Sequence, residues 1–161
     1  MVWHARDVME TKVKTVDAEL TLADLERVLL AERISGAPVL AKGKLVGIVS
    51  RSDIVRQISV ERTLAGVVQD FYRDVSPPTE SAADETARTS ESVAKRLATL
   101  RVKDAMIKTP ITVTPDEPLE GVARRMVDRR IHRILVTEGD KLVGIISTLD
   151  VIRLFAEGKV S

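Results

Sequence analysis

Apolar residues follow a helical spacing in two separate stretches of this chain. In one stretch the positions i, i+3, i+4, i+7 and i+8 are apolar, namely Leu119, Val122, Ala123, Met126 and Val127. The same kind of spacing occurs earlier in the chain, at Leu22, Leu25, Val28 and Leu29. Thr21 with Asp24 resembles a capping box, and Pro118 suits a first helical turn. The pattern therefore predicts one amphipathic helix in each half of the chain.

Each of these helices is followed by two short apolar runs that are separated by turn residues. The runs are 37–41 and 45–50 around Lys42-Gly43-Lys44, and 133–137 and 142–147 around Gly139-Asp140. A short connection that contains glycine favours an antiparallel hairpin. A short first strand is predicted at Val13–Val16 in the first half and at Ile111–Val113 in the second. A last helix is predicted over about 52–58 in the first half and 149–156 in the second. Each half therefore predicts the order β-α-β-β-α.

The two halves also match residue by residue. The segment Lys44–Ser50 (KLVGIVS) recurs as Lys141–Ser147 (KLVGIIS), an offset of 97 residues. When 4–56 is placed on 101–153 without a gap, 17 of 53 positions are identical. A fixed offset over that length indicates one supersecondary unit used twice. We expect the two copies to pack on one another, and we look for function in the clefts at their pseudo-two-fold seam.

The middle of the chain differs from both halves. Residues 76–92 contain only Ser, Thr, Pro, Ala and charged residues, a composition that predicts a mobile linker. Two amphipathic pieces on either side predict helices; one holds Leu64, Val67, Val68 and Phe71, and the other Val93, Leu97 and Leu100. We therefore expect a first repeat at 1–59, an insert at 60–100 and a second repeat at 101–161.

Composition narrows the class of protein. Apolar residues are 44% and charged residues 30% of 161 positions, as in soluble globular chains, and because only 2% are aromatic the core must be largely aliphatic. A net charge of +1 gives no basic field to recruit nucleic acid. The absence of cysteine excludes disulfides, thiolate metal sites and Cys nucleophiles. No signal peptide and no membrane-length apolar run are present, so we expect a cytoplasmic protein without a membrane partner.

The first candidate site follows the repeated motif. Ser50 and Asp53, like Ser147 and Asp150, place a hydroxyl at the end of a strand and a carboxylate three residues later. One interpretation is a helix-capping box that contributes about 1 kcal/mol to stability. The other is a nucleoside site, in which the carboxylate accepts both hydroxyls of a ribose and the helix start holds phosphate. One copy taken alone favours the cap.

The second candidate is the basic segment Arg129–Arg133, which could neutralise a phosphate. A solvated helix end is the alternative interpretation. Arg130 matches Arg33 in the first half and is therefore assigned a structural role. His132 and Arg133 replace Ser35 and Gly36, and this asymmetry favours anion binding by the pair.

Other chemistry finds no support in the sequence. His4 has no second ligand nearby, so we expect no metal site. There is no Ser-His-Asp arrangement, Walker loop, Rossmann fingerprint or pair of glycosidase-type acids. We therefore expect no catalytic residues and no enzyme.

Taken in order, these motifs resemble two CBS domains (cystathionine-β-synthase domains). In the first half the motifs are Asp7–Met9, Thr15-Val16, Ile34–Val39 and Leu45–Ile54; in the second they are Asp104–Met106, Pro110–Val113, Arg130–Arg133 and Gly144–Val151. The resemblance covers everything except the middle segment. It implies an α/β (α+β) fold, with two β-α-β-β-α repeats packed with pseudo-two-fold symmetry as in a stand-alone CBS pair, or Bateman module.

The resemblance also implies clefts that bind adenine nucleotides or related adenosyl ligands. Each cleft of such a pair draws on both repeats, so Asp53 would face His132 and Arg133, while Asp150 would face Ser35 and Gly36. The nucleotide-binding residues implied are Ser50, Ser52, Asp53, Pro110, Ile111, Ile131, His132, Arg133 and Ile134 for one cleft, and Lys12, Val13, Ser35, Ala37, Pro38, Ser147, Thr148 and Asp150 for the other.

The ligand implied is AMP, ADP or ATP, with S-adenosylmethionine as another possibility. CBS pairs are usually dimers, so a homodimer and a regulated protein partner are further expectations. The alternative is a structural module for dimerisation or partner docking, in which the Asp residues only cap helices.

Overall fold

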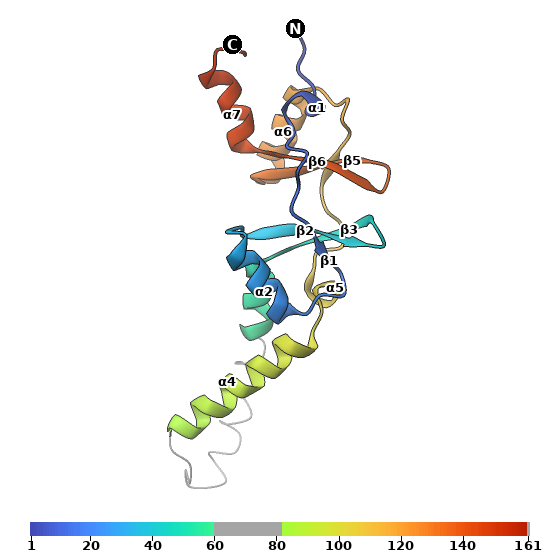
Figure 1. Cartoon of the computed structure of the whole chain (residues 1–161). Coiled ribbons are helices and arrows are strands. Elements are labelled where there is room, and N and C mark those ends of the chain that lie inside the picture. Colours follow the sequence, from blue (N-terminus) through green and yellow to red (C-terminus); the bar gives the residue numbers. More distant parts are fainter. Residues whose placement is uncertain (60–81, 161) are drawn as a thin grey trace. The chain divides into compact units, whose positions relative to one another are not determined.

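The computed structural model describes residues 1–59 and 82–160 and contains two three-stranded sheets (Figure 1). The first sheet has the order β1 (Val16–Asp17), β2 (Gly36–Ala41), β3 (Lys44–Ser50). Helix α2 (Leu22–Ala31) joins β1 to β2, and residues 51–59 are helical. The order strand, helix, strand, strand, helix predicted for the first half is confirmed.

The second half repeats this order. Strands β4 (Thr112–Val113), β5 (Arg133–Glu138) and β6 (Lys141–Ser147) form the other sheet, with helix α6 (Leu119–Arg129) before β5 and helix α7 (Thr148–Ala156) after β6. Strand β4 is parallel to β5, and β5 is antiparallel to β6. The register places Arg133 opposite Ser147 at the end of the sheet where α7 begins. The fold is therefore mixed α and β, as predicted.

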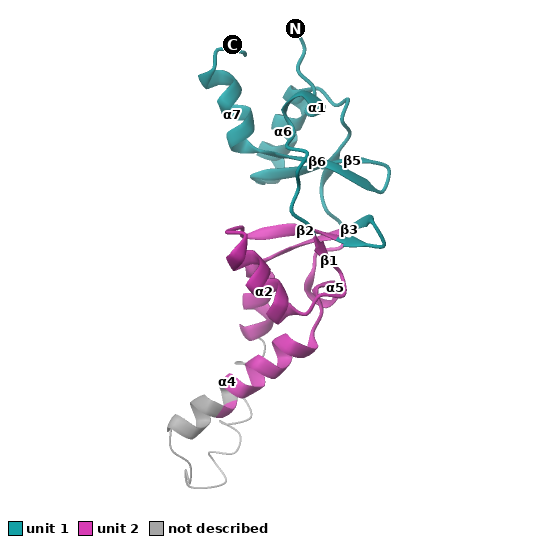
Figure 2. Ribbon diagram, viewed as in Figure 1, with its two compact units in different colours: residues 1–15, 40–46, 109–161 teal, residues 16–39, 47–108 magenta. Residues whose placement is uncertain are grey.

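Two compact units divide the chain in a way that the repeat does not anticipate (Figure 2). Unit 1 comprises residues 1–15, 40–46 and 109–161, and unit 2 comprises residues 16–39 and 47–108. The N-terminal segment, which contains helix α1 (Ala5–Val8), therefore belongs with the second half of the sequence. Helix α5 (Val102–Ala105), which precedes the second half, belongs with the first.

Backbone hydrogen bonds hold both of these exchanged segments. In unit 1 the Ala5 amide donates to the Glu117 carbonyl at 2.9 Å, and the Leu119 amide donates to the Trp3 carbonyl at 2.8 Å. In unit 2 the Val102 amide donates to the Leu20 carbonyl, also at 2.8 Å. Each unit therefore contains the segment that precedes the other half in the sequence.

The cores are aliphatic, as the low aromatic content predicts. The core cluster of unit 1 consists of Ala5, Val113, Leu119, Val122, Met126, Ile134, Val136, Ile146 and Leu154. The helix positions predicted to be apolar in the first half include three buried residues, Leu22, Leu25 and Leu29. Thr21 Oγ1 accepts from the Asp24 amide at 3.2 Å, but the Asp24 carboxylate pairs with Arg27 instead of returning to the backbone of Thr21. Only half of the expected capping box forms there.

The insert contains a helix where composition predicts a linker. Helix α4 (Ala82–Thr99) includes residues 82–92 of the expected 76–92 linker. Ala, Glu and Arg in this segment favour a helix. Leu97 is buried, and α4 packs against α2. The predicted helix at Val93, Leu97 and Leu100 falls on the end of α4. Residues 76–81 and the helix expected around Leu64 to Phe71 lie outside the described residues.

Both amphipathic helices end in a left-handed turn occupied by arginine. Arg33 has φ of 54° after α2, and Arg130 has φ of 53° after α6. The next amide closes the helix end in each case, from Ile34 to Leu29 and from Ile131 to Met126, both at 3.0 Å. An L-residue in this conformation costs roughly 1–2 kcal/mol, which is why glycine usually occupies it. The shared arginine therefore has a place in the backbone turn, in agreement with the structural role that the repeat assigns to Arg130.

Candidate functional site

The carboxylate of Asp53 is fixed where β3 passes into the helix at 51–59. Its Oδ2 accepts hydrogen bonds from the Ser50 amide at 2.7 Å and from Ser50 Oγ at 3.1 Å, and its Oδ1 accepts from Arg56 at 3.0 Å. Asp53 is 2% exposed. The predicted pairing of hydroxyl and carboxylate at this junction is therefore present, and it holds the carboxylate in one orientation.

Ser147 and Asp150 form the equivalent junction at the start of α7. Asp150 Oδ2 accepts from the Ser147 amide at 2.8 Å and from Ser147 Oγ at 2.5 Å. The Asp150 amide donates back to Ser147 Oγ at 3.2 Å, which completes a capping box. The side chain of Asp150 is 24% exposed, so this carboxylate is more open to solvent than that of Asp53. The capping contacts do not exclude a ligand, because a carboxylate has acceptor sites for about four hydrogen bonds.

His132 and Arg133 lie beside the second junction. The His132 carbonyl accepts from the Thr148 amide at 3.0 Å, so the backbone of His132 is tied to the first residue of α7. Arg133 is paired with Ser147 across β5 and β6. Both side chains are exposed. The structure thus brings the basic pair together with Ser147, Thr148 and Asp150 within unit 1.

The first half has the same backbone arrangement with different side chains. The Ser35 carbonyl accepts from the Arg51 amide at 2.9 Å. Gly36 follows, and a Cβ on Gly36 would lie 2.8 Å from the Val49 carbonyl oxygen and 3.2 Å from Ser50 Cβ. The repeat therefore keeps the connection between the two segments, while the basic pair occurs only in the second copy.

The remaining predicted residues divide between the two units. Unit 1 holds Lys12, Val13, Pro110, Ile111, Ile131 and Ile134 together with the basic pair and the second junction, and unit 2 holds Ser35, Ala37, Pro38, Ser50, Ser52 and Asp53. Ile134 is 1% exposed and belongs to the core cluster of unit 1. The expected pairing of Asp53 with His132 and Arg133 joins the two units and stays a prediction.

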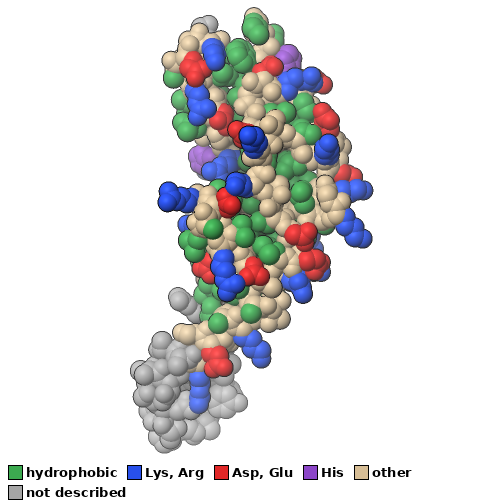
Figure 3. All heavy atoms as spheres, in the orientation of Figure 1, with side chains coloured by type: hydrophobic (Ala, Val, Ile, Leu, Met, Phe, Trp, Pro, Cys, Tyr) green, Lys and Arg blue, Asp and Glu red, His purple; other side chains and the backbone are tan. Residues whose placement is uncertain are grey.

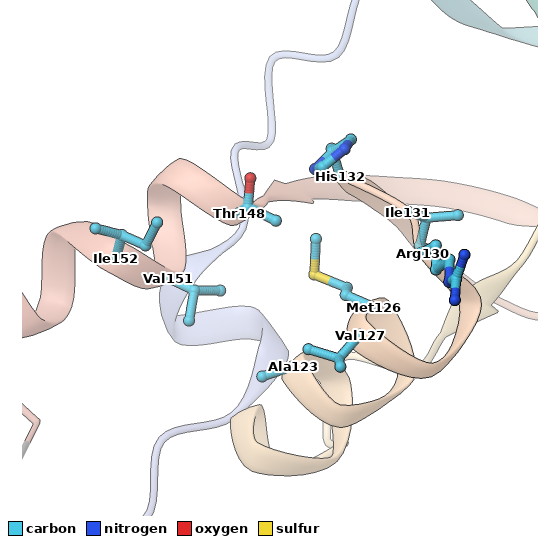
Figure 4. Close-up of a pocket in the computed structure, with 9 residues that line it drawn as sticks. All are labelled: Ala123, Met126, Val127, Arg130, Ile131, His132, Thr148, Val151 and Ile152. Carbon is cyan, nitrogen blue, oxygen red and sulfur yellow. The ribbon is translucent and has the colours of Figure 1, made fainter.

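An open hollow of about 420 Å³ lies between α6 and α7 in unit 1 (Figure 4). Three of its lining residues are predicted site residues, Ile131, His132 and Thr148. The others are Ala123, Met126, Val127, Arg130, Val151 and Ile152. The sequence offered no signal for the missed residues, because Val127 lies on the apolar side of the predicted helix like its buried neighbours and only the structure shows that it is 75% exposed.

Charges are mixed in this molecule. Figure 3 shows Lys and Arg side chains interspersed with Asp and Glu, in keeping with a net charge of +1. Among the residues that the structure describes, no group of three or more His, Cys, Asp or Glu side chains could hold a metal ion. Within the same ranges, 1–59 and 82–160, no helix is both long and apolar enough to cross a membrane.

The family follows from a direct match. Residues 5–60 and 102–157 each match the model of the CBS domain. These two ranges cover both halves of the repeat and leave out most of the insert. The chain therefore belongs to the CBS domain family and carries two CBS domains in tandem.

Known proteins resemble this chain over nearly its whole length. An uncharacterized protein of Methanocaldococcus jannaschii is 32% identical over 149 residues, which are 91% of this chain and 88% of that protein. Two longer curated relatives are covered over only 38% and 20% of their length.

Solved structures show the same fold. The structure of CBSX2 in complex with AMP matches with a TM-score of 0.68 at 20% identity, over 98% of this chain and 99% of that one. The CBS domain pair of protein MJ0100, in complex with 5′-methylthioadenosine and S-adenosyl-L-methionine, matches with a TM-score of 0.63 at 20% identity, over 99% of this chain and 100% of that one. Both neighbours are CBS domain proteins bound to adenosyl compounds.

Proposed function

We propose that this chain is a non-catalytic regulatory module that binds an adenine nucleotide or adenosyl ligand in clefts between its two CBS repeats. The observation that carries the proposal is the junction of hydroxyl and carboxylate that occurs twice, at Ser50 with Asp53 and at Ser147 with Asp150. Asp53 would accept the ribose hydroxyls, and His132 with Arg133 would hold phosphate. Asp150 with Ser35, Ala37 and Pro38 would form a second nucleoside site.

The chemistry of the residues supports this assignment. A fixed carboxylate recognises the two hydroxyls of a ribose, because each of its oxygens can accept a hydrogen bond. An exposed guanidinium binds phosphate in bidentate fashion. Pro110, Ile111 and Ile131 are each half-buried, as expected of side chains that would contact an adenine ring. The neighbours CBSX2 and MJ0100 add that proteins of this fold bind AMP, 5′-methylthioadenosine and S-adenosyl-L-methionine.

Thermal unfolding with separate additions of AMP, ADP, ATP and S-adenosylmethionine tests the proposal. A ligand that binds only the native state adds about 2.7 kcal/mol at 100 times its Kd. For a chain of this size, that corresponds to a rise in Tm of roughly 5–11 °C. Guanosine nucleotides at the same concentrations are the matched control. An unchanged Tm with all four adenosyl compounds would favour the structural module instead.

We also propose that a second copy of the chain covers the hollow between α6 and α7. Val127 and Ile152 line this hollow and are 75% and 59% exposed. Leu149 and Phe155, three residues before and after Ile152 on α7, are also exposed. An exposed apolar patch on a soluble protein marks an interaction site. The residues at the repeat offset, Leu30 and Val55, are also exposed. A repeated apolar surface suits the self-complementary contact of a symmetric dimer.

Charge introduced into this patch is expected to separate the dimer. We expect the wild-type chain to sediment as a dimer and Val127→Glu and Ile152→Glu to sediment as monomers, because each carboxylate would be buried without a partner. Val2→Glu is the matched control, since Val2 is 67% exposed and lies in the N-terminal segment. A monomeric wild type across the concentration range would contradict the dimer.

A further inference from the structure

Two methionines occupy equivalent places in the repeat but contact the glycine of the other half. Met9 and Met106 differ by the repeat offset of 97, as do Gly47 and Gly144. Met9 packs on Gly144 of β6, whereas Met106 packs on Gly47 of β3. The residue after each methionine, Glu10 or Ile107, forms a bridge to the same strand. We call each methionine together with this next residue an edge segment; the two edge segments are residues 9–10 and 106–107.

Each edge segment is held by one antiparallel bridge to the outer strand of a sheet. Glu10 and Ile145 exchange backbone hydrogen bonds at 2.9 and 3.0 Å. Ile107 and Ile48 exchange a similar pair at 2.9 and 3.0 Å. The methionine amides also donate to the preceding helices, Met9 to Ala5 at 3.0 Å and Met106 to Val102 at 2.9 Å. On the strand side, the contact beside each bridge is made by the thioether, which packs on the glycine before the bridged isoleucine.

Each thioether packs directly on the glycine of a strand, with no room for a further atom between them. A Cβ built on Gly144 would be 2.5 Å from Met9 Sδ, and one built on Gly47 would be 2.8 Å from Met106 Sδ. Both sulfur atoms therefore lie directly against the backbone of an edge strand. Oxidation would place a polar and bulkier sulfoxide in this close apolar contact, which weakens the packing of the side chain on the strand.

The four methionines of the chain differ in how accessible they are. Met1 is fully exposed, Met126 is 3% exposed in the core of unit 1, and Met9 and Met106 are half-buried. The sequence contains no cysteine, so a thiol does not compete for an oxidant. The methionines of the two edge segments therefore combine access for a small oxidant with a structural contact that oxidation would break.

We propose that Met9 and Met106 are oxidation sites for peroxide-class oxidants, and that their sulfoxides release the edge segments from β6 and β3. In the reaction the sulfur lone pair attacks one peroxide oxygen, the S–O bond forms and the O–O bond breaks. The sulfur is oxidised by two electrons, and the remaining oxygen leaves as water after it takes up the proton. The sulfoxide is larger and polar, and methionine sulfoxide reductases return it to the thioether.

Release of an edge segment would also change the backbone next to the proposed ligand site. Lys12 and Val13 follow the first edge segment closely, and Pro110 and Ile111 follow the second. Oxidation would loosen the backbone that leads to these residues and lower nucleotide affinity. This coupling rests on the proposed function, whereas the oxidation and release of the segments do not.

The test exposes the full chain to hydrogen peroxide and maps sulfoxides by peptide mass spectrometry. We expect Met1 to oxidise first, Met9 and Met106 next, and Met126 last. The oxidised chain should lose several degrees of Tm, and the amides of Ile145 and Ile48 should exchange hydrogen faster. Reduction by methionine sulfoxide reductases should restore both values.

Leucine variants separate this effect from general damage. The Met9→Leu/Met106→Leu double variant keeps the side-chain volume approximately, and its Tm should not respond to peroxide. Met126→Leu keeps both edge-segment thioethers and should respond like the wild type, even if the double variant fails to fold. The proposal is overturned if Met9 and Met106 oxidise no faster than Met126, or if their oxidation leaves Tm and amide exchange unchanged. AMP binding of the oxidised chain is measured separately, so a failed nucleotide proposal does not affect this result.

Discussion

Gly47→Ala should destabilise the protein by about 1–3 kcal/mol, the usual cost of an added atom in a filled space. A Cβ at this position would lie 2.6 Å from the Ile107 carbonyl oxygen and 2.8 Å from Met106 Sδ. The carbonyl oxygen is part of the bridge between Ile48 and Ile107, so it cannot move away without loss of those hydrogen bonds. Chemical unfolding with urea measures the change in the free energy of unfolding.

Gly144→Ala is the matched comparison and should cost less. The two atoms nearest to its Cβ are Met9 Sδ and Cγ, which can move away by a change of rotamer, and only Met9 Cβ, at 3.0 Å, is fixed by the backbone. Met9→Ala should therefore relieve much of the cost of Gly144→Ala, whereas Met106→Ala should leave most of the cost of Gly47→Ala, because the Ile107 carbonyl remains. Gly121→Ala in α6 should stabilise the protein by about 0.5–1 kcal/mol, since its nearest contact would be 3.6 Å away. Equal losses at Gly47 and Gly121 would contradict the steric argument.

The repeat made most of the fold predictable. Apolar periodicity located α2 and α6, and the apolar runs around Gly43 and Gly139 located the two hairpins. These features depend on local spacing, which a single sequence displays directly. The short helices α1 and α5 were not predicted, because four residues are too few to show a helical period.

Long-range pairing was not predictable from the pattern. The sequence shows that Met9 matches Met106 and that Gly47 matches Gly144, but it does not show that each methionine contacts the glycine of the other copy. The contact depends on which sheet the segment that carries the methionine joins. Contact with the glycine of the same copy and contact with the glycine of the other copy would both satisfy the same local pattern. The left-handed turns at Arg33 and Arg130 were missed for a related reason, because the usual marker of such a turn is glycine.

The candidate site was predictable in its parts. The junctions of Ser50 with Asp53 and of Ser147 with Asp150 form the hydrogen bonds that the motif indicates. The tie between His132 and Thr148 was not visible in the sequence, since it joins backbone atoms of residues 16 positions apart. The hollow beside α6 and α7 was also missed, because an amphipathic pattern does not distinguish a buried position from an exposed one such as Val127.

Asp53→Asn should lower AMP affinity by about 100-fold while it leaves the protein folded. The variant removes the negative charge that would accept the ribose hydroxyls, and two charge-assisted hydrogen bonds lost at 1.5 kcal/mol or more each correspond to about that factor. In the wild-type chain the Ser50 amide donates to Asp53 at 2.7 Å, and the Asn side-chain oxygen can still accept this hydrogen bond. The ion pair with the exposed Arg56 contributes little to stability. Isothermal titration calorimetry and thermal unfolding measure affinity and stability on the same sample.

Adenosine separates the ribose from the phosphate in the same experiment. Asp53→Asn should weaken AMP and adenosine by the same factor, because both ligands carry the ribose diol. Arg133→Ala should weaken AMP by about 10-fold or more and leave adenosine nearly unchanged, because only AMP offers the guanidinium a phosphate. Asp150→Asn is the internal comparison, since its carboxylate makes the same contacts with Ser147 but would belong to the other cleft. Equal losses of AMP and adenosine in Arg133→Ala would remove the phosphate role, and unchanged AMP affinity in Asp53→Asn would leave that carboxylate as a helix cap alone.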